Sequence, residues 1–185
     1  MSRTASKLSL QEFLDLPDND RYELVEGQPK PKMSPKYKHA SIQGWLFRLL
    51  DDWCNQEQCG RVCPEWGVVL QRQQEDWVPV PDLTYISYER LPQEWDEDEP
   101  CPVPPELVIE IISPGQTFGE LTQKATDYLL AGVDRVWVVE PKAQSVTIFQ
   151  RDKLAQTVWN EGVITDPLLP GLLLPVFQLF ARRRD

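Results

Sequence analysis

The sequence has no run of about 18 apolar residues, so no part of the chain is expected to span a membrane. Its first residues, MSRTASKLSLQEFLDLP, start with basic side chains but contain no apolar core of the signal-peptide type. Internal repeats, low-complexity tracts and linkers are absent as well. These absences predict a cytoplasmic protein with a single domain over residues 1–185.

Cysteine is scarce, and its four positions are Cys54, Cys59, Cys63 and Cys101. Spacings of five and four residues match no tight Cys-x-x-Cys zinc knuckle, so ordinary reduced thiols are the better interpretation. Basic residues are also few, 19 against 29 acidic ones, which gives a net charge of −10. A general nucleic-acid coat protein would usually be basic and is therefore disfavoured.

The charge is unevenly distributed along the chain. Residues 89–106 contain seven acidic side chains and one arginine, a composition typical of a solvated loop. The segment 30–48 instead contains only basic charges, at Lys30, Lys32, Lys36, Lys38 and Arg48. A local basic face of this kind can contact phosphates, although the field of the whole protein does not steer DNA towards it.

Apolar residues make up 41% of the chain, enough for a sizeable core. Ser9 and Glu12 form a capping-box pattern that begins a short helix, which Pro17 ends. Apolar side chains recur at helical spacing over residues 38–54, and again over 117–131. Two longer helices are therefore predicted, and Gly132 ends the second.

The strands are predicted from runs of apolar and β-branched residues between turn signals. Residues 21–34 predict two short strands that turn at Gly27, and residues 144–160 predict a peripheral hairpin. The remaining strands are expected at 61–71, 77–87, 106–112 and 134–141. This order of helices and strands predicts an α/β fold with a mixed central sheet flanked by helices.

The strand at 106–112 contains one carboxylate, Glu110, within an apolar run. Alternation places Val108, Glu110 and Ile112 on one face, and apolar residues also occupy the opposite face. Such a strand is covered on both sides. Because an ionised carboxylate is costly there unless it is paired, hydrogen-bonded or bound to a metal, Glu110 requires a partner.

Asp82 is the candidate partner on a neighbouring strand. Pro79 and Pro81 cannot donate to a β-ladder, so this strand begins at an edge or an opening of the sheet. Taken alone, Asp82 is more simply a turn cap. Two carboxylates on adjacent strands, however, commonly hold Mg²⁺, which polarises a phosphodiester and lowers the pKa of an attacking water.

Hydrolysis of a phosphodiester also benefits from a cation near the developing charge. Lys124 lies at the margin of the apolar face of the 117–131 helix, and by spacing alone it is a surface lysine that covers the core edge. The helix follows the Glu110 strand after only a few residues, which brings Lys124 within reach of that carboxylate. The combination of Asp82, Glu110 and Lys124 is a more specific signal of phosphodiester hydrolysis than any one of these residues.

Several motifs appear in a distinctive order: RYELVEG, MSPKYKHASIQGWLFRLL, VPDLTYIS, PPELVIEIISPGQT and ELTQKATDYLLAGVDRVWVVEP. In this order they resemble a bacterial family labelled "putative restriction endonuclease", part of the PD-(D/E)XK nuclease superfamily. The resemblance covers roughly residues 9–180. It implies a restriction-endonuclease-like fold, a mixed central sheet flanked by helices.

The resemblance also implies roles for single residues. Asp82 and Glu110 match the metal-binding carboxylates, and the Ile111 carbonyl is expected to point towards the same ion. The superfamily lysine would stand at position 112, where this chain has isoleucine. Lys124 resembles the relocated lysine that members of this family carry on the following helix.

Two further residues come from the N-terminal part. Glu26 resembles an acidic residue that some superfamily members add to the site. His39, the single histidine, matches one at the start of the long helix. It either bonds backbone there or contacts the site or a phosphate. Lys36 and Lys38 are candidate contacts to the DNA backbone.

The leading hypothesis is a Mg²⁺-dependent endonuclease acting on DNA, with Mn²⁺ able to replace Mg²⁺. A homodimer is expected, because two cuts in a duplex favour two sites. One alternative is a catalytically silent module that binds DNA or a protein partner. Another is a metal-dependent hydrolase of RNA or of a small phosphodiester.

Overall fold

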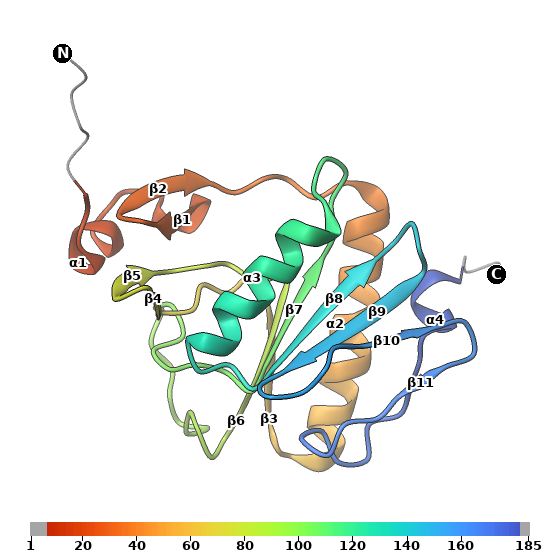
Figure 1. The fold of residues 1–185 in the computed structure, drawn as a ribbon. Helices are drawn as coiled ribbons and strands as arrows, with labels where there is room; N and C mark the ends of the chain where they lie inside the picture. The colour runs from red at the N-terminus through yellow and green to blue at the C-terminus, as the bar shows by residue number, and fades with distance from the viewer. Residues whose placement is uncertain (1–6, 182–185) are drawn as a thin grey trace.

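The computed structural model describes residues 7–181, and its centre is a six-stranded sheet in the order β10-β9-β8-β7-β6-β3 (Figure 1). The strands are β3 (Gly60–Pro64), β6 (Leu83–Ser87), β7 (Leu107–Ile111), β8 (Arg135–Glu140), β9 (Ser145–Gln150) and β10 (Gln156–Trp159). Only β7 and β8 pair in parallel, and every other pair is antiparallel. The sheet is therefore mixed, as predicted.

Strand β7 lies inside the sheet, and all five of its residues are buried. Leu107, Ile109 and Ile111 pack into one core cluster, and Val108 packs into the other. This is the alternation that the sequence predicts. The strand is covered on both faces, so the position of Glu110 on it is an interior one.

Two long helices cover the two faces of the sheet (Figure 1). Helix α2 (Tyr37–Glu57) packs on the face of Leu107 and Ile109, and α3 (Phe118–Leu130) packs on the face of Val108. Thr117 and Glu120 form a capping box at the start of α3, which sets where the helix begins after β7. The loop between β7 and α3 is short, and it holds α3 close to the end of β7.

The N-terminal part forms a separate layer beside the sheet. It contains α1 (Leu10–Leu14), the 3₁₀ turn η1 (Asn19–Arg21), and the antiparallel strands β1 (Tyr22–Val25) and β2 (Gln28–Pro31). Ser9 and Glu12 form the predicted capping box, and Gly27 lies in the turn between the two strands with a φ of 72°. Leu24 exchanges backbone hydrogen bonds of 3.1 and 3.0 Å with Val78, which attaches this layer to the segment before β6.

Two predicted strands, 61–71 and 77–87, are each divided in the structure. Their outer halves form a small hairpin of β4 (Leu70–Arg72) and β5 (Glu75–Trp77), while the inner halves are β3 and β6 of the central sheet. Prolines mark the divisions: Pro64 ends β3, and Pro79 and Pro81 separate β5 from β6. A residue without a backbone N–H interrupts a ladder, which explains why the continuous strands were wrong.

The C-terminal part extends the sheet and then returns to α2. The predicted hairpin at 144–160 is β9 and β10, with β10 as the edge strand of the central sheet. Strands β11 (Val163–Ile164) and β12 (Leu174–Pro175) pair, and α4 (Phe177–Phe180) follows. No helix within residues 7–181 is long and apolar enough to cross a membrane.

Candidate functional site

Asp82 directly follows the segment Pro79–Pro81 and immediately precedes β6, which lies between β7 and β3 in the sheet. Strands β6 and β7 pair with Leu83 opposite Ile109. Continuing this antiparallel register by one residue places Asp82 opposite Glu110, on the same face of the pair. The two predicted carboxylates therefore come together because their strands are neighbours in the sheet.

The contacts of Asp82 fix both its side chain and its backbone. One carboxylate oxygen, Oδ2, accepts a hydrogen bond of 2.6 Å from the Ile111 backbone N–H, and Oδ1 lies 3.1 Å from Nε2 of His39. The Asp82 backbone carbonyl accepts a bond of 2.9 Å from Nε2 of Gln43. His39 and Gln43 are one turn apart on α2, so one helix face holds Asp82 at two points.

His39 is buried, and its Nε2 atom contacts the Asp82 carboxylate. Burial lowers the pKa of the imidazole, but the hydrogen bond to Asp82 and the negative charges of Asp82, Glu65 and Glu110 together outweigh burial and leave the pKa above 6.5. The charged imidazole is therefore favoured beside the carboxylate. Lys36 and Lys38, by contrast, are exposed at the start of α2.

Glu110 is buried and has two partners, both on α3. Its Oε1 atom accepts a hydrogen bond of 2.7 Å from the Tyr128 hydroxyl and lies 2.9 Å from Nζ of Lys124. Burial raises the pKa of Glu110 to about 7, since the charges of Asp82 and Glu23 add to the effect while Lys124 opposes it. The carboxylate that needed a partner has one in Lys124.

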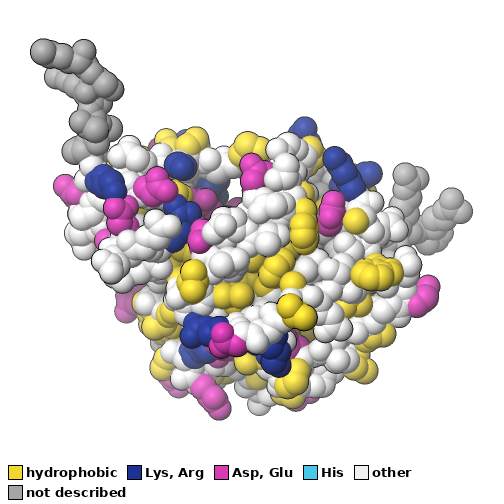
Figure 2. All heavy atoms as spheres, in the orientation of Figure 1, with side chains coloured by type: hydrophobic (Ala, Val, Ile, Leu, Met, Phe, Trp, Pro, Cys, Tyr) yellow, Lys and Arg dark blue, Asp and Glu magenta, His cyan; other side chains and the backbone are white. Residues whose placement is uncertain are grey.

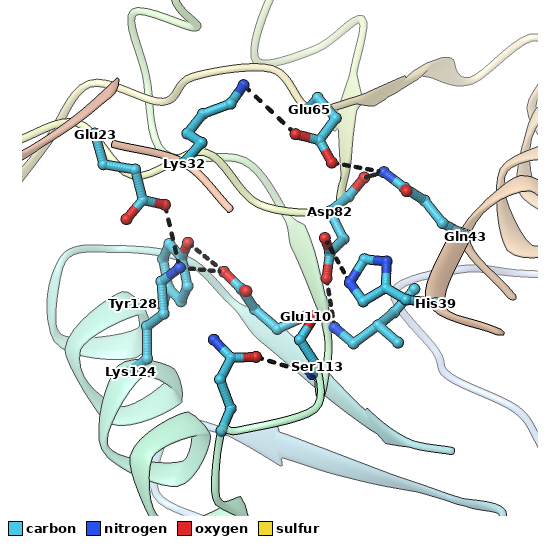
Figure 3. Close-up of polar contacts among 12 residues, drawn as sticks. Glu23, Lys32, His39, Gln43, Glu65, Asp82, Glu110, Ser113, Lys124 and Tyr128 are labelled. Atoms are coloured by element: carbon cyan, nitrogen blue, oxygen red, sulfur yellow. Dashed lines mark hydrogen bonds and ion pairs between the residues drawn. The ribbon is translucent and has the colours of Figure 1, made fainter. Parts of the chain in front are cut away.

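Lys124 points from α3 towards the end of β7, as Figure 3 shows. Its Nζ lies between two carboxylates, 2.9 Å from Glu110 and 3.3 Å from Oε1 of Glu23. Burial lowers the pKa of this amine, but the two carboxylates have the larger combined effect and raise the pKa above its usual value. Lys124 therefore stays an ammonium throughout the physiological range.

Glu23 on β1 is a residue of the cluster that the sequence interpretation missed. Its Oε1 also accepts a hydrogen bond of 2.9 Å from the Val80 backbone N–H. Val80 is the one residue between Pro79 and Pro81, so it has the only backbone donor in that three-residue segment. Glu23 thus connects Lys124 to the segment that leads into Asp82.

Glu26, which the family resemblance implied, is outside this cluster. It lies in the turn after β1, two-thirds exposed, with its Oε1 2.9 Å from a guanidinium nitrogen of Arg72. The pattern of YELVEG contains a signal that distinguishes the two residues. Glu23 is inside a strand, next to the fully buried Leu24, whereas Glu26 precedes a turn glycine.

The residues that meet here fit a magnesium ion. Asp82 and Glu110 supply carboxylate oxygens, and both contacts made by Glu110 use Oε1. Ile111 directs its N–H to Asp82, and because the N–H and C=O of a strand residue point to the same side, its carbonyl faces that side too. Mg²⁺ is usually held by one or two carboxylates together with waters and substrate phosphates.

The site does not enclose an ion with protein ligands alone. Within residues 7–181, no group of three or more His, Cys, Asp or Glu side chains is arranged to hold a metal. Water and a phosphate oxygen would have to complete the coordination. An open site of this type suits a metal that acts on a bound phosphodiester.

Comparison with known families places the chain in one of them. A family described as "Putative restriction endonuclease" (Uma2) matches residues 10–177. Because the match covers nearly the whole sequence, the protein belongs to this family, as the motif order predicted. Family membership supports a nuclease function. A search of curated proteins gave no match.

Two solved structures resemble the chain to different degrees. A crystal structure from Anabaena variabilis, described as a "putative nuclease belonging to DUF820", superposes with a TM-score of 0.80 at 24% identity. The match covers 94% of this chain and 97% of that one. A cryoEM structure described as a DrdV–DNA complex matches with a TM-score of 0.40 at 18% identity, over 64% of this chain and 69% of that chain. The first of these confirms the restriction-endonuclease-like α/β fold.

The raised pKa of Glu110 predicts a pH-dependent stability. In the folded protein the Glu110 carboxyl group has a pKa of about 7, against 4.5 for an ordinary glutamate. Stability should therefore be lost as the pH rises from about 4.5 to about 7, by up to about 3 kcal/mol. The measurement is urea unfolding in EDTA for the wild type and Glu110→Gln between pH 5 and 8. A wild-type-minus-variant difference that does not fall with pH would contradict this prediction.

The two N-terminal glutamates are predicted to differ in their effect on cleavage. Glu23→Gln keeps an acceptor for the Val80 N–H but removes the charge beside Lys124, so the cleavage rate should fall about tenfold. Glu26→Gln loses only an exposed ion pair with Arg72, which contributes little. Single-turnover cleavage of both variants checks the assignment, and a larger loss for Glu26→Gln would reverse it.

Proposed function

We propose that this protein is a Mg²⁺-dependent endonuclease that hydrolyses phosphodiester bonds of DNA. The observation that carries the proposal is the meeting of three residues from three elements. Asp82 before β6, Glu110 on β7 and Lys124 on α3 converge, with Lys124 Nζ 2.9 Å from Glu110 and Asp82 bonded to the next residue of β7. Two carboxylates and an ammonium at one point match the needs of metal-assisted phosphodiester hydrolysis.

Asp82, Glu110 and the Ile111 carbonyl are the residues that would hold the metal, and Mn²⁺ should replace Mg²⁺. When bound, the ion supplies a Lewis acid that polarises the phosphodiester and makes an attacking water more acidic. The protein residues around it keep the ligands in place. His39 and Gln43 fix the side chain and the carbonyl of Asp82, and both bonds come from a buried helix face.

Lys124 supplies the cation that the strand position 112 lacks. Its ammonium is held between Glu23 and Glu110, so its position is determined before substrate binds. A preorganised positive charge stabilises the negative charge that develops on the phosphate. The Tyr128 hydroxyl donates to the same oxygen of Glu110 and restricts the carboxylate further.

A second candidate function is a nuclease-like module that binds DNA or a protein partner without cutting. The specific observation in its favour is that Glu110 and Lys124 neutralise each other in a close ion pair, in a protein with net charge −10. An inactive scaffold would not need to bind a divalent ion. Metal binding therefore separates the two candidates.

The test combines metal binding with cleavage. Thermal melting with Mg²⁺ or Mn²⁺ should raise the melting temperature of the wild type but not that of Asp82→Asn. Cleavage is then compared for duplex DNA, single strands, RNA and a chromogenic phosphodiester, each with Mg²⁺ and with EDTA. DNA cleavage that requires the metal supports the proposal. A failure to bind either ion supports the silent module, and preferential cleavage of RNA or of the small ester would change the substrate class.

A homodimer belongs to the same proposal, because two sites would allow both strands of a duplex to be cut. Sedimentation of the protein with and without DNA measures its oligomeric state directly. A monomer that nicks one strand would contradict the dimer while leaving the hydrolytic site in place.

A further inference from the structure

The most basic part of the chain lies next to the site. Residues 27–50 contain four lysines and one arginine but no aspartate or glutamate, in a chain of net charge −10. On the face seen in Figure 2, by contrast, basic and acidic side chains are interleaved. We call residues 30–38, which run from β2 into the first turn of α2, the basic strap. A single-sign segment in an acidic protein is a local attraction for an anion.

One end of the basic strap lies beside the candidate site (Figure 3). Nζ of Lys32 is 3.4 Å from Oε2 of Glu65, and Oε1 of Glu65 accepts a hydrogen bond of 3.0 Å from Gln43. The same amide nitrogen of Gln43 donates to the Asp82 carbonyl. Three successive contacts therefore link Lys32 of the strap to Asp82, a proposed metal ligand.

The other end of the basic strap opens into a groove of about 910 Å³ between α2, the turn after β8 and the C-terminal helix α4. Tyr37, Lys38, Trp45, Arg48 and Phe180 are among its lining residues. Among the residues that the structure describes, the lining includes two cations and three aromatic rings but no carboxylate. Its chemistry therefore suits a ligand that is both anionic and aromatic.

The aromatic side chains distinguish an unpaired strand from a duplex. Tyr37 is 86% exposed and Met33 is 73% exposed, although both are large apolar side chains. The Arg48 guanidinium lies 5.2 Å from the ring centre of Trp45, which adds a charged plane beside an aromatic one. Lysine side chains alone would bind the phosphate backbone of any nucleic acid, whether single-stranded or double-stranded. Exposed rings offer stacking, and only an unpaired base presents a free face to them.

We propose that the basic strap and its groove bind single-stranded DNA, as an unpaired flank that leads to the site. The proposal rests on the nuclease function proposed above and narrows its substrate to DNA with a single-stranded part. Lys36 and Lys38 contact phosphates, and Tyr37 stacks on a base. Lys32 and Tyr37 are five positions apart in the chain, a reach of at most about 17 Å. The groove beyond Tyr37 extends this path, so a bound strand would follow both the strap and the groove.

The experiment measures binding without cleavage. Full-length Glu110→Gln protein is titrated, in the absence of divalent cations, against fluorescent 12-nucleotide single-stranded DNA, the blunt duplex of the same sequence, and the duplex with a 12-nucleotide overhang. The single strand and the overhang should bind about tenfold more tightly than the blunt duplex. In the same background Tyr37→Ala should weaken binding of the single strand about fivefold or more, with little change for the duplex.

Control variants test stacking and charge separately. Tyr37→Phe keeps the ring and should keep the affinity. Trp159→Ala removes an exposed aromatic on the edge strand β10, outside the groove, and should change nothing. Replacing Lys36 and Lys38 by Ala should reduce the slope of log affinity against log salt by about 0.7 for each lost phosphate contact.

Equal affinity for single strand and blunt duplex would overturn the proposal, as would a Tyr37→Ala loss that is the same for both. Tighter binding of RNA of the same sequence would overturn the assignment to DNA. Binding of none of these nucleic acids would leave the groove to a protein partner and would also overturn it. If the wild type cleaves blunt duplex DNA as well as DNA with a single-stranded part, this inference is refuted and the nuclease function remains. If the protein binds single-stranded DNA through Tyr37 but cleaves no DNA, the nuclease function is refuted and the binding inference remains.

Discussion

Asp82→Asn and Glu110→Gln are each expected to abolish metal-dependent DNA cleavage, with a loss of at least about a thousandfold. Each substitution keeps the size of the side chain but removes one of the two charges that would hold the ion. The loss should appear in single-turnover rates at saturating DNA. Mg²⁺ should also fail to raise the melting temperature of either variant, which is a readout independent of activity.

The same substitutions should not unfold the metal-free protein. Asp82 and Glu110 repel each other across neighbouring strands, and Glu110 is buried, so neutralising one of them relieves an unfavourable charge. The matched control is Glu106→Gln, four residues earlier in the chain. Glu106 accepts hydrogen bonds from Ser87 and pairs with Arg90 at 3.2 Å, so its loss should lower stability by about 1–3 kcal/mol without a specific loss of cleavage. Wild-type cleavage by Asp82→Asn or Glu110→Gln would show that the site is elsewhere.

Lys124→Ala is expected to lose about a hundredfold or more in cleavage rate while still binding the metal. Lys124 reaches into the cluster from α3, and its ammonium is the one cation seen within 3 Å of Glu110 among the described residues. Lys153→Ala, an exposed lysine in the turn after β9, is the matched control and should cut normally. Near-normal cleavage by Lys124→Ala would reduce Lys124 to a structural partner of Glu110.

A second-site change tests whether the lysine has moved from strand to helix. Ile112 follows β7 and packs partly buried on the α3 face, the face of Glu110. Adding Ile112→Lys to Lys124→Ala should restore part of the lost activity if both positions address the same phosphate. The new ammonium must be desolvated, which costs stability, so melting curves accompany the rates. If the double variant is stable but recovers no cleavage, lysines at positions 112 and 124 do not address the same phosphate.

Much of this architecture follows from local patterns in the sequence. Alternating apolar residues in 106–112 specify a strand covered on both faces, and Glu110 is recognisable there because a lone carboxylate in such a strand needs a partner. The spacing of apolar residues located α2 and α3, since helical periodicity depends only on neighbours along the chain. Pro79 and Pro81 marked where β6 begins for a similar reason, because a missing N–H acts locally.

Only the tertiary structure decided which side chains share the site. Glu23 and Glu26 are three residues apart, yet only Glu23 reaches Lys124, because the pairing of Leu24 with Val78 turns that strand towards the proline segment. Gln43 carries no charge pattern and was not identifiable until α2 lay against Asp82. Contacts between residues 101 positions apart, as for Glu23 and Lys124, depend on the packing of whole elements. The sequence by itself therefore determined the two long helices and the buried faces of the central strands, while packing determined where the strands at 61–71 and 77–87 divide and which side chains form the site.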